Sequence, residues 1–228
     1  MERVPLISVG ACEVHLRVIS NTAISLDGRI TTVANERFTL GSEADLRLMS
    51  QLRNQVDAVL VGGQTFRHWP EPKLPLAKHL AEPMNTGTKW TVLVTRHFAK
   101  HVHEDFFSQP NVRMLVFAQS SSVGSIANCE VLLRDEITPQ GIVADLAERG
   151  IQSLLIEAGG NLIFQFLDAN VLNELYVTLC PKIIGGQGAP SLADGRGFLQ
   201  SQIRNLKLLS HQIIGDEFYL HYEVTLPR

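Results

Sequence analysis

Residues 153–167 read SLLIEAGGNLIFQFL, an apolar run that ends in a carboxylate and continues through two glycines into a helical pattern. This order predicts a buried strand that leads directly into a helix. Gly159 and Gly160 let the backbone approach an anion, and the free N–H groups and dipole of the following helix favour negative charge there. Two interpretations fit. Either the glycines only close a tight turn and Glu157 is a solvated strand end, or the turn binds a phosphate and Glu157 faces the same crevice.

Strand and helix patterns alternate along the chain on both sides of this turn. Apolar alternation or short apolar runs predict strands within 13–20, 57–61, 91–95, 112–117, 131–133, 153–156 and 175–180. The tail, 213–226, predicts an antiparallel hairpin. Because strands that alternate with helices imply right-handed parallel crossovers, we expect an α/β fold. Its central sheet is mixed and mostly parallel, flanked by helices, in a single domain over residues 1–228 with a core at about 13–226.

The expected helices carry recognisable end signals. Ser42 to Asp45 fits a relaxed capping box at the start of a helix that runs to residue 54. Thr65 is placed to cap a short helical turn. Thr138 precedes a proline, and Gly150 lies just beyond the last apolar position of the helix between them.

Composition excludes several classes of function. The formal net charge is −3, and no basic cluster interleaves with aromatic residues, so we expect no nucleic-acid partner. Three cysteines lie far apart without metal-ligand spacing, which favours free thiols in a reducing compartment. His101 and His103 would share a face of an extended segment, but no acidic or cysteine partner completes a set, so we expect no metal. No stretch approaches the roughly 18 apolar residues of a membrane span, so we expect a cytoplasmic protein.

A long segment from Trp69 to Gly87 carries four prolines and little periodicity. Aperiodic segments of this length in compact domains are usually functional or mobile. We expect this segment to border the site.

Five blocks of sequence, taken in order, resemble a known family. They are SLDGR (25–29), LR (52–53), VGGQT (61–65), IEAGG (156–160) and PKIIGG (181–186). Together they resemble the reductase domain of riboflavin biosynthesis, the C-terminal half of the bacterial bifunctional deaminase-reductase, whose fold is similar to that of dihydrofolate reductase. The blocks lie within residues 14 to 226. No His-x-Glu with Pro-Cys-x-x-Cys of the zinc deaminase half occurs, so we expect a stand-alone reductase.

The resemblance implies that NADPH reduces the ribosyl group of 5-amino-6-(5-phosphoribosylamino)uracil or a close analogue, and that the protein forms a homodimer. It implies that Glu157 and Arg53 contact the substrate and that the cofactor lies along residues 159–165. The residues expected to bind the cofactor are Thr65, Arg96, Gly159, Gly160, Asn161, Leu162 and Gly186. Hydride delivery needs a proton source, and a carboxylate such as Glu157 beside the hydride path can bind sugar hydroxyls or polarise the opened ribose.

Three of these assignments have structural alternatives. Arg53 binds substrate, or it closes the C-terminus of its helix, where a cation is favoured. Asp27 positions nicotinamide or substrate, or it only starts an Asp-Gly turn. Arg96 grips the 2′-phosphate of NADPH with its planar fork, or it is a solvated arginine directly after a strand.

The chain departs from the family pattern at two places. Trp69 stands where the family has an acidic residue, and no matching arginine follows in the proline-rich segment. Arg37 and Thr39 stand where the family has a serine and a tryptophan, and Arg37 either supplies positive charge toward a substrate phosphate or lies at the surface. Two other functions therefore stay open: a paralogous pterin or dihydrofolate-type reductase, and a catalytically silent nucleotide-binding module.

Overall fold

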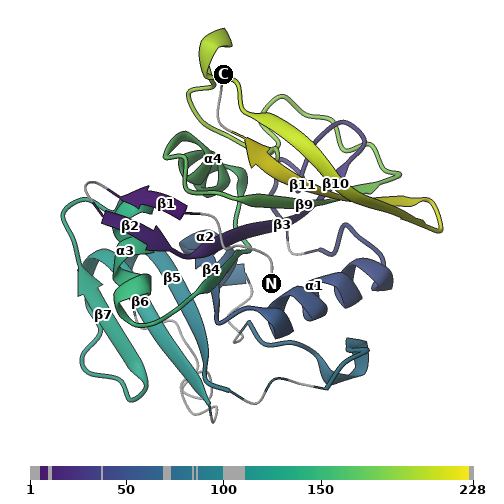
Figure 1. Ribbon diagram of the computed structural model, residues 1–228. Helices are drawn as coiled ribbons and strands as arrows, with labels where there is room; N and C mark the ends of the chain where they lie inside the picture. Colours follow the sequence, from purple (N-terminus) through teal and green to yellow (C-terminus); the bar gives the residue numbers. More distant parts are fainter. Residues whose placement is uncertain are drawn as a thin grey trace.

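The computed structural model describes residues 6–9, 12–36, 38–68, 73–83, 85, 87–99 and 111–225. In these ranges nine strands form one sheet in the order β10-β11-β9-β3-β8-β4-β5-β6-β7 (Figure 1). Their bounds are β3 Arg17–Ser25, β4 Ala58–Gly62, β5 Lys89–Phe98, β6 Val112–Ser121, β7 Cys129–Leu133, β8 Ser153–Ile156, β9 Glu174–Cys180, β10 Asn205–Ile214 and β11 Glu217–Thr225. A separate two-stranded sheet pairs β1 (Leu6–Val9) with β2 (Cys12–His15).

The strand directions confirm the predicted mixed sheet. The seven strands from β9 to β7 pair in parallel. β11 runs antiparallel to β9, and β10 runs antiparallel to β11, so the chain ends in the expected antiparallel hairpin. The hairpin forms one end of the sheet and β7 the other (Figure 1).

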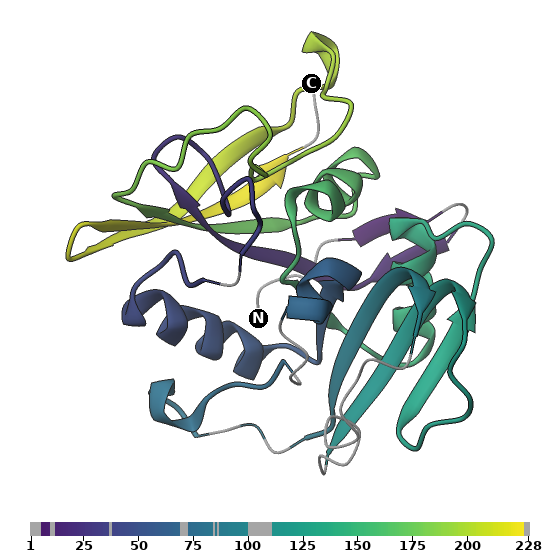
Figure 2. The same ribbon diagram turned by 180° about the vertical axis from the view of Figure 1, so that it is seen from behind.

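Helices cover both faces of the sheet. They are α1 (Glu43–Gln55), α2 (Gly63–His68), α3 (Pro139–Glu148) and α4 (Gly160–Asp168), with short 3-10 turns η1 (Ala77–His79) and η3 (Gln200–Gln202). Side chains alternate across a strand, so Leu60 packs in the core cluster with α3 and α4, whereas Val59 packs in the cluster with α1. Figure 2 shows α1 and α4 on opposite sides of β3. No helix in the described ranges is long and apolar enough to cross a membrane.

Two predicted helix ends are confirmed. Ser42 Oγ accepts a hydrogen bond from the Ala44 N–H at the start of α1, and Thr138 Oγ accepts one from the Gly141 N–H at the start of α3. Gly150, just beyond α3, has φ +76°, a conformation that glycine adopts without strain.

Four local predictions were wrong or incomplete. Thr65 does not cap α2 but lies inside it. Arg96 does not follow β5 but lies within it, because the strand continues along β6 to Phe98. β10 begins well before residue 213, and its early part was missed because every residue of β10 is exposed and shows no alternation. The capping box at Ser42 is also incomplete, because its backbone N–H donates to Glu217 Oε1 (2.8 Å) and not to Asp45.

Several sequence predictions fall on residues outside the described ranges. Arg37 and Trp69 are among them, as are His101 and His103. Of the proline-rich segment, residues 73–83, 85 and 87 are described.

Candidate active site

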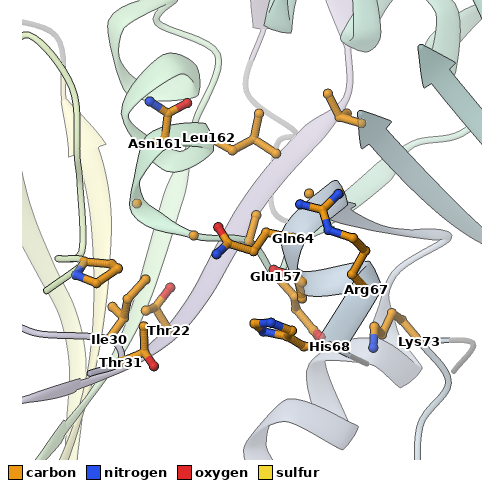
Figure 3. Close-up of a pocket in the computed structure, with 18 of the residues that line it drawn as sticks. Thr22, Ile30, Thr31, Gln64, Arg67, His68, Lys73, Glu157, Asn161 and Leu162 are labelled. Carbon is orange, nitrogen blue, oxygen red and sulfur yellow. The ribbon is translucent and has the colours of Figure 1, made fainter. Parts of the chain in front are cut away.

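A cavity of about 1690 Å³ lies where β4, β5 and β8 end and α1, α2 and α4 approach (Figure 3). The carboxyl ends of parallel strands are where α/β sheets usually bind ligands. Residues 73–76 also line the cavity, so the described start of the proline-rich segment borders it as expected. Of the residues that depart from the family pattern, Thr39 lines the cavity.

Glu157 and Arg53 form a two-bond ion pair in the cavity wall. Arg53 Nε lies 2.7 Å from Glu157 Oε1, and Arg53 Nη2 lies 2.6 Å from Glu157 Oε2. Arg53 Nη1 also donates to the Leu74 carbonyl at 3.1 Å. Both side chains are only about one-tenth exposed. The pair ties the last turn of α1 to the end of β8 and fixes the direction of the carboxylate.

Another residue closes the C-terminus of α1. The Lys89 ammonium at the start of β5 donates to the carbonyls of Asn54 (3.0 Å) and Val56 (2.5 Å). Burial lowers the pKa of Lys89, while Asp57 acts in the opposite direction. Lys89 thus occupies two carbonyls at this helix end, whereas the Arg53 guanidinium pairs with Glu157 in the cavity wall.

The two glycines after Glu157 have different surroundings. Gly159 is the N-cap of α4 with φ −70°, and a Cβ built on it would meet nothing within 4 Å. A Cβ on Gly160 would lie 2.1 Å from the Ser191 carbonyl oxygen and 2.8 Å from Asp194 Oδ2. Gly160 is therefore required by the close packing of the segment at 191–194 against α4, whereas Gly159 leaves open space at the helix N-terminus.

The first two turns of α4 contribute two polar side chains and one apolar side chain to the cavity wall. Asn161, Leu162 and Gln165 all line it, and Gln165 Nε2 donates to Asn161 Oδ1 at 2.7 Å. The N-cap, Gly159, has no side chain to cap the helix N-terminus, and the helix dipole favours an anion there. The predicted cofactor stretch from Gly159 to Gln165 thus lies along one wall.

The ends of β4 and β5 form the adjoining wall. A Cβ on Gly63 would lie 2.8 Å from Thr95 Oγ1, so a glycine is needed where α2 begins against β5. Thr65 is half-buried and lines the cavity, and the exposed Arg96 lines it as well. The structure thus brings Thr65 and Arg96 to the same cavity as Gly159.

Asp27 and Gly186 lie elsewhere in the described structure, since neither lines this cavity. Asp27 Oδ1 accepts hydrogen bonds from Ser25 Oγ (2.6 Å) and the Ile184 N–H (3.0 Å), and Oδ2 accepts one from the Gly185 N–H (2.7 Å). The Ser25 hydroxyl first, and then these two N–H groups, lower the pKa of Asp27 to about 2. Asp27 ties the loop after β9 to the end of β3, which supports its turn-forming interpretation.

Three basic residues that no sequence pattern indicated line the cavity. Arg67 and His68 from α2 and the buried Lys73 lie beside Glu157 (Figure 3). Lys73 belongs to the aperiodic proline-rich segment, where no pattern indicates which side chains face inward. Asp45, which the sequence indicates only as a residue at the start of a helix, also lines the cavity.

Comparisons with known proteins agree on one family. The family model described as the RibD C-terminal domain matches residues 17–220. The 2,5-diamino-6-ribosylamino-4(3H)-pyrimidinone 5′-phosphate reductase of Methanothermobacter thermautotrophicus is 28% identical over 217 residues, which cover 91% of this chain and 97% of that protein. The riboflavin biosynthesis protein RibD of Actinobacillus pleuropneumoniae is 28% identical over 223 residues, 92% of this chain but 57% of that protein.

Solved structures show the same fold. A Thermotoga maritima deaminase and 5-amino-6-(5-phosphoribosylamino)uracil reductase superposes with a TM-score of 0.75 at 23% identity, covering 92% of this chain and 57% of that one. A pyrimidine reductase-like protein of Corynebacterium diphtheriae gives a TM-score of 0.74 at 19% identity, covering 92% of both chains. The chain therefore spans little more than half of the two-domain relatives and nearly all of the shorter ones.

Proposed function

This chain belongs to the RibD C-terminal domain family, and from that membership we propose that it is an NADPH-dependent reductase of a ribosylaminopyrimidine 5′-phosphate. The substrate is 5-amino-6-(5-phosphoribosylamino)uracil or its 2,5-diamino-pyrimidinone analogue, which the full-length-matched relatives are named for. The product carries a ribityl chain in place of the ribosyl group.

The observation that carries this proposal is the Glu157–Arg53 pair beside the glycine turn. A carboxylate has about four acceptor positions, and Arg53 uses two of them. The remaining positions can accept hydrogen bonds from sugar hydroxyls. Because Arg53 holds both oxygens, the carboxylate is oriented before the substrate arrives, which lowers the entropic cost of binding.

Three features of the cavity support NADPH as the cofactor. Gly159 leaves unoccupied space in front of the α4 N-terminus, so a pyrophosphate can approach the backbone there. Thr65 and Asn161 line the same space and offer hydrogen bonds, and Arg96 lies at its rim. When bound, the cofactor supplies the hydride, and these residues bind and orient it.

The basic group favours a phosphorylated substrate over a neutral pterin. Arg67, His68 and Lys73 gather on the Glu157 side of the cavity (Figure 3). Lysine and arginine are the usual partners of phosphate groups. A pterin has no phosphate to use them.

The deciding experiment is turnover of purified protein with NADPH and each ribosylaminopyrimidine phosphate, with dihydropterins as competing substrates. Oxidation of NADPH with the ribosyl substrates only, and formation of a ribityl product by mass spectrometry, is the expected result. If only dihydropterins are turned over, the protein is a pterin reductase and the proposal is wrong. NADPH binding, seen as a rise in Tm, without any turnover would support the silent nucleotide-binding module.

Replacing Arg96 with alanine is expected to weaken NADPH binding about tenfold to a hundredfold and to leave NADH binding unchanged. Charge-assisted hydrogen bonds to phosphate contribute about 1.5–3 kcal/mol. Calorimetric titration of both cofactors measures the ratio. The control is Arg47→Ala on α1, where the exposed Arg47 pairs with Glu43 across 3.6 Å. An equal loss of affinity for NADPH and for NADH would show that Arg96 does not bind the 2′-phosphate.

We also propose a homodimer that covers the C-terminal hairpin. Every residue of β10 is exposed, among them the apolar Leu206, Leu208, Leu209, Ile213 and Ile214. A long apolar edge strand invites pairing or aggregation unless a partner covers it. We expect a dimer in sedimentation experiments, which Leu208→Glu converts to monomer. Leu133→Glu on the opposite edge strand, also exposed, is the matched control and should remain dimeric. A monomeric wild type would contradict the proposal.

A further inference from the structure

Asp45 is a buried carboxyl in the cavity wall that the assignments above do not use. It lies in the first turn of α1, and its side chain is not needed to complete the helix cap, since Glu217 receives the Ser42 N–H. Asp45 is only 8% exposed, and within the described ranges its buried Oδ1 has no hydrogen-bond partner. Burial disfavours a carboxylate whose oxygens are not all hydrogen-bonded, whereas a protonated carboxyl is tolerated there.

The groups around Asp45 also favour its protonated form. Burial is the largest cause of the raised pKa of Asp45, and the carboxylates of Glu217 from β11 and Glu157 after β8 raise it further, while the Thr178 hydroxyl from β9 lowers it. The thiol of Cys180 and the phenol of Tyr219 also interact with Asp45. Two cations lie near these carboxylates in the described structure: the Lys182 ammonium donates to the Leu40 carbonyl, and the Arg53 guanidinium pairs with Glu157.

Further buried polar atoms without partners line the same cavity in the described structure. Among the described residues that line the cavity, Asn21 Oδ1, Thr22 Oγ1 and Thr31 Oγ1 are buried and make no hydrogen bond. Figure 3 shows Thr22 and Thr31 together on one side of the cavity, with Arg67 and Lys73 on the other. Buried polar groups in folded proteins nearly always have partners, so this wall is suited to a ligand that carries several hydroxyl groups.

We propose that Asp45 is the proton donor of the reductase, in a subsite where Thr22 and Thr31 bind hydroxyl groups of the ring-opened substrate. This inference rests on the proposed function. Asp45 and Glu157 then have different roles set by their surroundings, a recurring arrangement of paired carboxyl groups in enzymes. Both Glu157 oxygens accept hydrogen bonds from Arg53, so Glu157 binds and orients, whereas Asp45 carries the proton.

The substrate reacts in its open-chain imine form. Hydride from NADPH adds to the ribosyl C1′ and forms a C–H bond. The electron pair of the C1′=N double bond moves to the nitrogen, which takes the proton of the Asp45 carboxyl and becomes an amine. NADP⁺ and the Asp45 carboxylate remain, and the carboxylate regains its proton from water.

The test is Asp45→Asn, with Asp216→Asn in the exposed β10–β11 turn as control. General acids typically contribute 10²–10⁴-fold. We expect Asp45→Asn to lower kcat at least a hundredfold, to leave NADPH affinity unchanged, and to remove the fall in wild-type kcat at rising pH. The control should keep wild-type kcat and its pH profile.

Stability against pH gives a readout independent of turnover. A carboxyl whose pKa is raised by folding stabilises the fold while it is protonated, and this contribution is lost as pH rises above the ordinary value of 3.8 and through the raised pKa. The Tm of wild type should therefore fall relative to that of Asp45→Asn across this window.

The outcomes separate the two proposals. Wild-type turnover together with full kcat and an unchanged pH profile in Asp45→Asn would overturn the donor assignment and leave the reductase function standing. No turnover by wild type would overturn both. If Asp45→Asn does not fold, a wild-type kcat that shows no decline at high pH and no solvent deuterium isotope effect would equally reject Asp45 as donor.

Discussion

Replacement of Glu157 with glutamine is expected to lower kcat/KM at least a hundredfold. The amide preserves the shape of the side chain but loses the negative charge that faces Arg53 across bonds of 2.6 and 2.7 Å. It also replaces one acceptor oxygen with a donor, so a sugar hydroxyl loses its partner. Hydrogen bonds to a charged group contribute about 1.5–3 kcal/mol each, and two such losses exceed a hundredfold.

The same change should destabilise the fold. Removing one member of a buried ion pair leaves an uncompensated charge and costs about 3–5 kcal/mol. Urea unfolding measures this loss. The matched control is Glu130→Gln, which breaks a pair of similar length (Arg149 Nη2 to Glu130 Oε1, 2.6 Å) whose carboxylate is about half exposed and outside the cavity. It should cost under about 1 kcal/mol and leave turnover unchanged.

Arg53→Lys tests whether the two-bond geometry itself matters. Lysine keeps the charge but cannot reach both Glu157 oxygens and the Leu74 carbonyl as a planar fork. We expect a loss in kcat/KM comparable to that of Glu157→Gln, and less than additive losses in the double variant because the two residues act as one unit. Glu157→Gln within threefold of wild type would contradict this account of the site.

The sequence predicted those parts of the fold in which burial produces a regular pattern of apolar residues. The strand that leads to Glu157 is fully buried over Leu154, Leu155 and Ile156, so it produces a clear apolar run. β10 has no buried residue, and nothing in its sequence distinguished its first half from a loop. Edge strands are defined by a neighbouring strand and not by a core, which is why a single sequence underpredicts them.

The sequence indicated those residues of the site whose placement follows from the strand or helix next to them in the chain. Glu157 and Gly159 come directly after a strand, and the carboxyl end of a parallel strand usually faces a ligand. Contacts between residues far apart in the sequence could not be predicted. Asp27 binds the backbone of Ile184 and Gly185 across more than 150 residues, and Asp45 is released from helix capping by Glu217 of the last strand. Such roles depend on tertiary contacts that no local pattern encodes.

Gly160→Ala and Gly159→Ala are expected to affect different properties, although the two glycines are adjacent: the first lowers stability, and the second weakens NADPH binding. The Gly160 methyl group would lie 2.1 Å from the Ser191 carbonyl oxygen, which is backbone and must move together with the Ser191–Asp194 hydrogen bonds. Overpacking of this kind costs about 1–3 kcal/mol and sometimes more. We expect the Tm of Gly160→Ala to fall by roughly 6–12 °C for a loss of about 3 kcal/mol.

Gly159→Ala should fold but bind NADPH about tenfold more weakly. A methyl group at Gly159 meets no atom within 4 Å, and the backbone there, with φ −70° and ψ 164°, accepts alanine. Its effect on stability should stay within about 1 kcal/mol, the usual range for a change at an N-cap. The methyl group would occupy the space through which a pyrophosphate reaches the α4 N-terminus. Calorimetric titration with NADPH, together with thermal unfolding of both variants, separates the two roles. If Gly159→Ala bound NADPH as tightly as wild type, the cofactor would have to approach the sheet by another route, and the opening in front of α4 would only be a turn.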